Sequence, residues 1–141
     1  MRILRYLICA AYWIFLTVLL LVPNPAAVVG MKRVPVFPWG DIGIHFTAFS
    51  ILTILVHATR WPKRPGWVVV AVLLAYGIAT ESLQYFVPPR AVELKDYTEN
   101  IIGVLVASGI VWLALHFRER WAPSEVSPCD EVLPRTLESR L

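Results

Sequence analysis

Polar side chains capable of chemistry lie at the ends of apolar runs in this sequence. Asp41 and His45 are four residues apart at the start of one run, so a helix would present both on one side. Glu81 and Gln84, three residues apart near the end of the next run, would also share a helix face. Carboxylates near an imidazole support ion pairing or general acid–base catalysis, and an amide orients polar groups.

A further polar group surrounds the start of the last apolar run. Glu93 and Asp96 come just before it, and Asn100 follows Asp96 by four residues. Arg90 lies in the same segment, where a guanidinium binds phosphate or carboxylate, or simply contacts lipid headgroups. Together with the first two groups, these residues predict one binding site.

Helix capping is an alternative role for the aspartates. Asp41 and Asp96 both precede predicted helix starts, where a carboxylate accepts backbone N–H bonds. Asp96 with Glu99 three residues later also matches the capping-box pattern. Capping and a functional role are compatible, and the sequence leaves both open.

Glu81 is the ionisable residue placed deepest in an apolar run. It lies about six residues, or roughly 9 Å, inside the predicted helix end. The helix dipole disfavours an anion near a C-terminus, so a carboxylate there needs a cation. We expect a pair with His45 or Arg90; the alternative is an isolated neutral carboxyl. Ionisable groups inside a membrane indicate function by default.

No local spacing matches a known metal or nucleophile motif. The sequence has no H-E-x-x-H pattern, so we predict no metal ligands and no cofactor. A metal site formed by His45 with nearby carboxylates is the less favoured alternative. It also has no G-x-S-x-G pattern, which weakens the case for an enzyme.

The elements that position these residues are four apolar runs. Hydrophobic residues make up 57% of the 141 residues and charged residues 16%, against about 25% charged in soluble domains. A spanning helix needs about 20 largely apolar residues. We therefore predict an all-α membrane protein, a four-transmembrane-helix bundle within residues 1–120, and a disordered cytoplasmic tail over 121–141. The predicted spans are Tyr6 to Val22, Ile42 to Ala58, Trp67 to Val87 and about Tyr97 to Phe117.

Charge predicts the orientation and excludes nucleic acid as a partner. A net charge of +3, with basic residues in short clusters, gives no nucleic-acid-binding stripe. Seven basic residues near span ends fall on one side and four on the other, which places both termini in the cytoplasm. The larger set is Arg2, Arg5, Arg60, Lys63, Arg64, Arg118 and Arg120. The first run could instead be a signal peptide, but its length favours a retained helix.

In the polar residues at the ends of its last three apolar runs, the chain resembles the VanZ-like family of small bacterial membrane proteins. The resemblance covers roughly residues 41–115, and Ile42 stands where that family typically has Lys. It implies a compact four-helix protein in the bacterial plasma membrane, in a family whose name-giving member is associated with low-level teicoplanin resistance. The matching motifs are Asp41-x-x-x-His45, Glu81-x-x-Gln84, Arg90 with following acidic residues, and Asp96-x-x-x-Asn100-x-x-Gly103.

Three functions fit these observations. We favour a non-enzymatic envelope protein that binds a membrane lipid, a lipid-linked cell-wall precursor or a lipophilic antibiotic at an outward-facing polar site. The first alternative is a membrane-embedded enzyme in which His45, oriented by Asp41 or Glu81, is the general acid or base. The second is a proton-coupled transporter using Glu81 and His45, for which four helices leave little room unless the chain forms a homo-oligomer.

Overall fold

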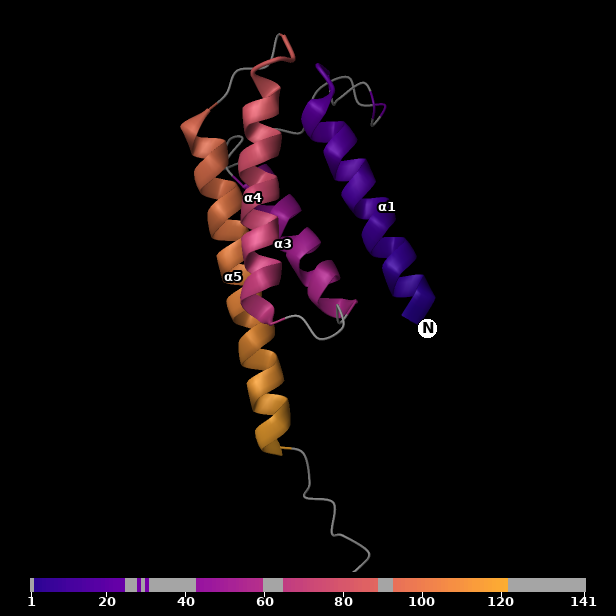
Figure 1. The fold of residues 1–141 in the computed structure, drawn as a ribbon, viewed down its shortest axis with the longest axis vertical. Helices are drawn as coiled ribbons and strands as arrows, with labels where there is room; N and C mark the ends of the chain where they lie inside the picture. Colours follow the sequence, from indigo (N-terminus) through magenta and orange to yellow (C-terminus); the bar gives the residue numbers. More distant parts are fainter. Residues whose placement is uncertain are drawn as a thin grey trace, which may run out of the picture.

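Four helices make up the part of the chain that the computed structural model describes, residues 2–24, 28, 30, 43–59, 65–88 and 93–121. They alternate in direction, so the start of α3, the end of α4 and the start of α5 meet at one end of the bundle (Figure 1). No strand occurs in these ranges, and the predicted all-α bundle is confirmed. The helices are α1 (Arg2–Leu21), α3 (Ile44–Ala58), α4 (Gly66–Gln84) and α5 (Leu94–Trp121).

Three of these helices are long and apolar enough to cross a membrane. They are α1, α4 and α5, whereas α3 is apolar but has only 15 residues. Large side chains such as Ile14, Ile78 and Leu105 are exposed on their outer faces. Exposed apolar surface on several sides of a bundle is the arrangement expected for a protein surrounded by lipid.

Helix α4 ends earlier than the sequence predicts, at Gln84 instead of Val87. The three residues after it form i→i−3 bonds, for example from the Val87 N–H to the Gln84 carbonyl at 2.9 Å. The residue before a proline is disfavoured in the α conformation, and Pro88 follows Val87. The last turn therefore tightens before the chain leaves the bundle.

Helix α5 is longer than predicted at both ends, with 28 residues. It begins before Asp96, whose N–H bonds the carbonyl of Glu93 at 3.1 Å, so Asp96 lies in the first turn and is not the capping residue. At the other end it continues through Arg118 and Arg120, good helix formers that complement the negative end of the dipole. This end projects beyond the other helices (Figure 1).

Helices α3 and α5 form the most extensive contact in the bundle. Gly103 allows it, because a Cβ there would lie 2.6 Å from the carbonyl oxygen of Phe46. Ser50 Oγ donates to the Gly103 carbonyl at 3.3 Å across the same contact. Small residues let membrane helices approach closely.

Helix α1 packs against α3 and α4 through aromatic and hydroxyl groups. Tyr12 donates to the carbonyl of Ala48 at 3.0 Å, and the hydroxyls of Thr17 and Tyr76 are 2.8 Å apart. The Trp13 and Tyr76 rings pack edge to face with centroids 5.2 Å apart. These contacts join α1 to the other helices of the bundle.

Candidate functional site

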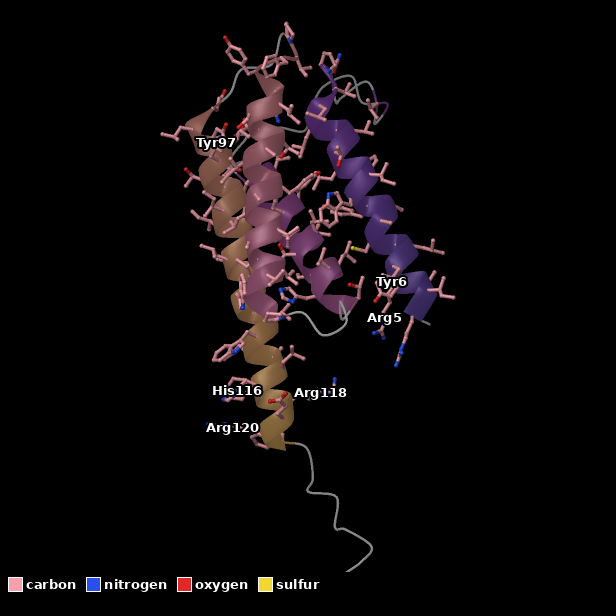
Figure 2. All side chains as sticks on the ribbon, in the orientation of Figure 1. Arg5, Tyr6, Tyr97, His116, Arg118 and Arg120 are labelled. Carbon is pink, nitrogen blue, oxygen red and sulfur yellow. The ribbon has the colours of Figure 1, made fainter. Side chains whose placement is uncertain are left out.

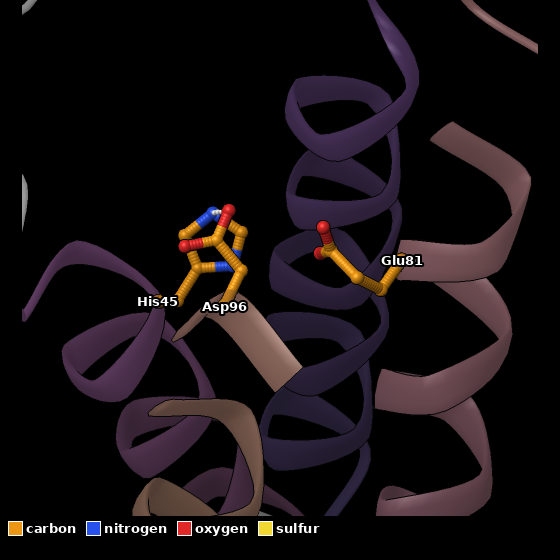
Figure 3. Close-up of side chains that lie close together, drawn as sticks. All are labelled: His45, Glu81 and Asp96. Atoms are coloured by element: carbon orange, nitrogen blue, oxygen red, sulfur yellow. Dashed lines mark ion pairs between the residues drawn. The ribbon is translucent and has the colours of Figure 1, made fainter. Parts of the chain in front are cut away.

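Three helix ends bring an imidazole and two carboxylates together. His45 lies in the first turn of α3, Glu81 in the last turn of α4 and Asp96 in the first turn of α5. One ligating atom from each lies within 4.8 Å of those from the other two. Figure 3 shows the carboxylate of Glu81 pointing from α4 toward His45 and Asp96.

The His45 ring lies between two side chains of α5. Its Nε2 lies 3.7 Å from Oδ2 of Asp96, an ion pair when the imidazole is protonated. Its Nδ1 lies 3.2 Å from Oδ1 of Asn100. An amide oxygen only accepts hydrogen bonds, so Nδ1–H is the donor. The edge of the ring that carries Nε2 is then turned toward the carboxylates.

Burial differs across this group. Glu81 is fully buried, although it is a carboxylate in an apolar helix. His45 and Asp96 keep 14% and 19% of their side-chain surface exposed, so the group is reachable at that end of the bundle. A charge that is buried needs pairing or coordination to offset its lost hydration.

Two buried amides lie one helical turn from this group, Gln84 three residues after Glu81 on α4 and Asn100 four residues after Asp96 on α5. Gln84 and Asn100 are 1% and 3% exposed. Nε2 of Gln84 and Nδ2 of Asn100 have no hydrogen-bond acceptor within the described ranges. Most buried polar atoms are hydrogen-bonded, so two such donors near one helix end require an explanation. We call His45, Glu81, Gln84, Asp96 and Asn100 the polar cluster.

Glu99 has a structural role that the sequence did not reveal. Its Oε2 accepts the backbone N–H of Gly43 at 3.0 Å, and Lys95 Nζ lies 3.8 Å from its other oxygen. Gly43 precedes α3 with a φ of 108°, a conformation that favours glycine. Glu99 thus ties the start of α3 to α5, a contact between positions 56 residues apart that local spacing does not indicate.

Three further predicted site residues are not part of the polar cluster as defined. Glu93 is exposed just before α5. Asp41 and Arg90 lie outside the described residues, and so does the predicted tail beyond Trp121. His57, in the last turn of α3, lies at the opposite end of that helix from His45, and its Nε2 is 3.5 Å from Ser108 Oγ.

A family model described as VanZ/LLP1 matches residues 14–115. The chain belongs to this family. Comparison with curated proteins and with solved structures finds no match. The polar cluster of this VanZ/LLP1 protein lies wholly within the matched range, as do α3 and α4 and most of α5. Family membership together with the apolar helices establishes a membrane protein.

The chemistry available to the polar cluster follows from its groups. Two amide nitrogens donate to oxygen atoms of a ligand, and the imidazole exchanges a proton or binds a cation. The two carboxylates attract cations and repel anions unless their charge is offset.

Proposed function

We propose that this VanZ/LLP1 protein binds the polar headgroup of an amphiphile at the polar cluster. The observation that carries the proposal is the pair of buried amide donors, Gln84 Nε2 and Asn100 Nδ2, without acceptors among the described residues. Phosphate or carbonyl oxygens of a headgroup would accept from both. The apolar outer faces of the helices would hold the ligand's hydrocarbon chain in the bilayer.

A lipid-linked cell-wall precursor and a lipophilic glycopeptide such as teicoplanin share this chemistry, a polar headgroup on an apolar chain. A single-chain polyprenyl phosphate represents the first and teicoplanin the second. The corresponding polyprenol, which lacks the phosphate, measures how much the headgroup contributes to binding. Arg90, on the same side by its place in the sequence, would add a cation for a phosphate.

The test is native mass spectrometry of the full chain in detergent, titrated separately with these three compounds. We expect the variant Gln84→Leu to weaken binding of the preferred ligand about 10-fold or more, since a hydrogen bond to a charged group contributes ~1.5–3 kcal/mol. Ser82→Ala, an exposed change on the same turn of α4, is the matched control and should bind as wild type.

Folding stability separates a binding role for Gln84 from a packing role. Removing a buried donor that has no acceptor should leave the unfolding temperature unchanged or raise it. A Gln84→Leu protein that is less stable yet binds normally would assign Gln84 to packing and contradict the proposal. Recovery of a chemically altered ligand would indicate an enzyme instead of a binding protein.

We also propose that the polar cluster faces outward from the bacterial plasma membrane, with both termini in the cytoplasm. Figure 2 supports this, because Arg5 of α1 lies toward the same end of the bundle as Arg118 and Arg120 of α5, while Tyr97 lies at the other end. Basic residues near helix ends favour the cytoplasmic side.

Single cysteines at Glu93 and Arg120 test the orientation, in a background of Cys9→Ala and Cys129→Ser. We expect a membrane-impermeant thiol reagent to label position 93 but not position 120 in intact cells. The reverse pattern would place the polar cluster in the cytoplasm.

A further inference from the structure

We propose that His45, Glu81 and Asp96 bind a divalent transition-metal ion, a site that no local motif in the sequence indicates. The three residues come from α3, α4 and α5, and their ligating atoms lie within 4.8 Å of one another. A metal site built on three helices uses the rigid part of the fold, and Figure 3 shows the three side chains converging.

The distances suit a metal ion after small side-chain adjustments. Metal–nitrogen and metal–oxygen bonds are about 2.0–2.2 Å, so two ligands of one tetrahedral ion are ~3.4 Å apart. His45 Nε2 and Asp96 Oδ2 are 3.7 Å apart, longer than a hydrogen bond and close to that separation. On metal binding, rotation of the two carboxylates would close the remaining separations, which are at most 4.8 Å.

Asn100 orients the imidazole as metal-binding histidines require. A ligating histidine donates its second ring N–H to a nearby oxygen, which fixes the tautomer and the ring plane. Here Nδ1–H donates to Oδ1 of Asn100 at 3.2 Å. When the imidazole is neutral, Nε2 then turns its lone pair toward the two carboxylates, an arrangement that is repulsive unless a cation lies between them.

Charge balance favours the metal over the proton. A protonated His45 offsets one of the two carboxylate charges, whereas a divalent cation with a neutral imidazole offsets both. Glu81 is fully buried in an apolar bundle, so a cation bound beside its carboxylate would offset part of the hydration that the carboxylate loses on burial.

The donor set indicates which ions would bind. One imidazole and two carboxylates, with no thiolate, suit Zn²⁺ or Mn²⁺ and disfavour Cu⁺. The bound ion would also remove the repulsion between the carboxylates and a phosphate headgroup. Metal binding is nevertheless independent of the amphiphile, because all three ligands belong to the protein.

The test uses the full chain without a histidine tag, stripped with a chelator in detergent and titrated with Zn²⁺ and with Mn²⁺ by calorimetry. We expect one ion per chain and at least a 10-fold loss of affinity in each of His45→Gln, Glu81→Gln and Asp96→Asn. His116→Gln, at the opposite end of α5, is the control for adventitious binding and should match wild type.

X-ray absorption of the Zn²⁺ complex provides a second readout, with one imidazole and otherwise oxygen ligands expected. Asn100→Leu should weaken the metal through ring orientation while leaving all three ligands in place. Absence of stoichiometric binding in folded wild-type protein would overturn the proposal, and so would equal affinity in wild type and His45→Gln. Amphiphile binding measured in the presence of chelator tests the proposed function independently of the metal site.

Discussion

Replacing Gly103 by alanine should separate α3 from α5. The new Cβ would lie 2.6 Å from the Phe46 carbonyl oxygen, and ordinary contact begins at 3.4 Å, so the helices must move apart by about 0.8 Å. Both partners are backbone atoms or fixed to backbone, so no side-chain rotation relieves the contact. Overpacking of this kind costs about 1–3 kcal/mol, and the higher helix propensity of alanine returns up to ~1 kcal/mol.

The same chain provides a matched control. A Cβ at Gly109, also in α5, would meet nothing within 4 Å, so Gly109→Ala should gain the propensity term alone. Gly77→Ala should fall between the two, because its nearest neighbours, Cε1 of Phe49 at 3.1 Å and Cβ of Asn100 at 3.3 Å, are less close than the Phe46 carbonyl oxygen is to position 103. Thermal unfolding in one detergent should therefore rank Gly109→Ala above wild type, and Gly103→Ala below it by roughly 2–8 °C.

The Gly103→Ala substitution should also alter the geometry of the polar cluster. His45 precedes Phe46, and Asn100 is three residues before Gly103, so the separation acts directly on their 3.2 Å hydrogen bond. A further 0.8 Å would carry that bond beyond the ~3.5 Å limit of a useful contact. Metal affinity should fall in Gly103→Ala and not in Gly109→Ala. If the two variants unfold at the same temperature, the close approach of α3 and α5 is wrong.

Three further changes test other contacts. Tyr76→Phe removes the hydroxyl that lies 2.8 Å from Thr17, and should cost about 1 kcal/mol of unfolding free energy by thermal denaturation. Glu99→Gln weakens the bond to the Gly43 N–H and should cost ~1 kcal/mol by the same measurement, with faster hydrogen exchange at the start of α3. Lys95→Gln breaks only a half-exposed pair, so its effect should stay below ~0.5 kcal/mol and vanish in high salt.

The helices and the depth of their polar residues could be predicted from the sequence, because both depend on the length of each apolar run and on where polar residues fall within it. The bounds were less accurate: α4 stops at Gln84 under the influence of a following proline, and α5 continues through the polar residues after Phe117. The positions of His45, Glu81 and Asp96 near the ends of their apolar runs likewise predicted that they form one site. It could not give their approach to within 4.8 Å, which depends on how three helices rotate and pack.

The roles of Glu99 and Asn100 depend on tertiary contacts in the same way. The i, i+3 spacing of Asp96 and Glu99 predicts a capping box within one helix, but Glu99 binds the N–H of Gly43, which precedes another. Asn100 was predicted as a ligand-binding residue, and its hydrogen bond to His45 adds a positioning role. Contacts between residues more than 50 positions apart leave no trace in local spacing.

The shortness of α3 has a consequence for the surrounding bilayer. At 1.5 Å per residue its 15 residues span about 22 Å, whereas the hydrocarbon core of a membrane is about 30 Å thick. Such hydrophobic mismatch is relieved by local thinning of the bilayer or by polar groups reaching toward the interface. Thinning at the start of α3 would bring headgroups and water closer to His45, so we expect membrane thickness, set by acyl-chain length, to influence access to this end of the bundle.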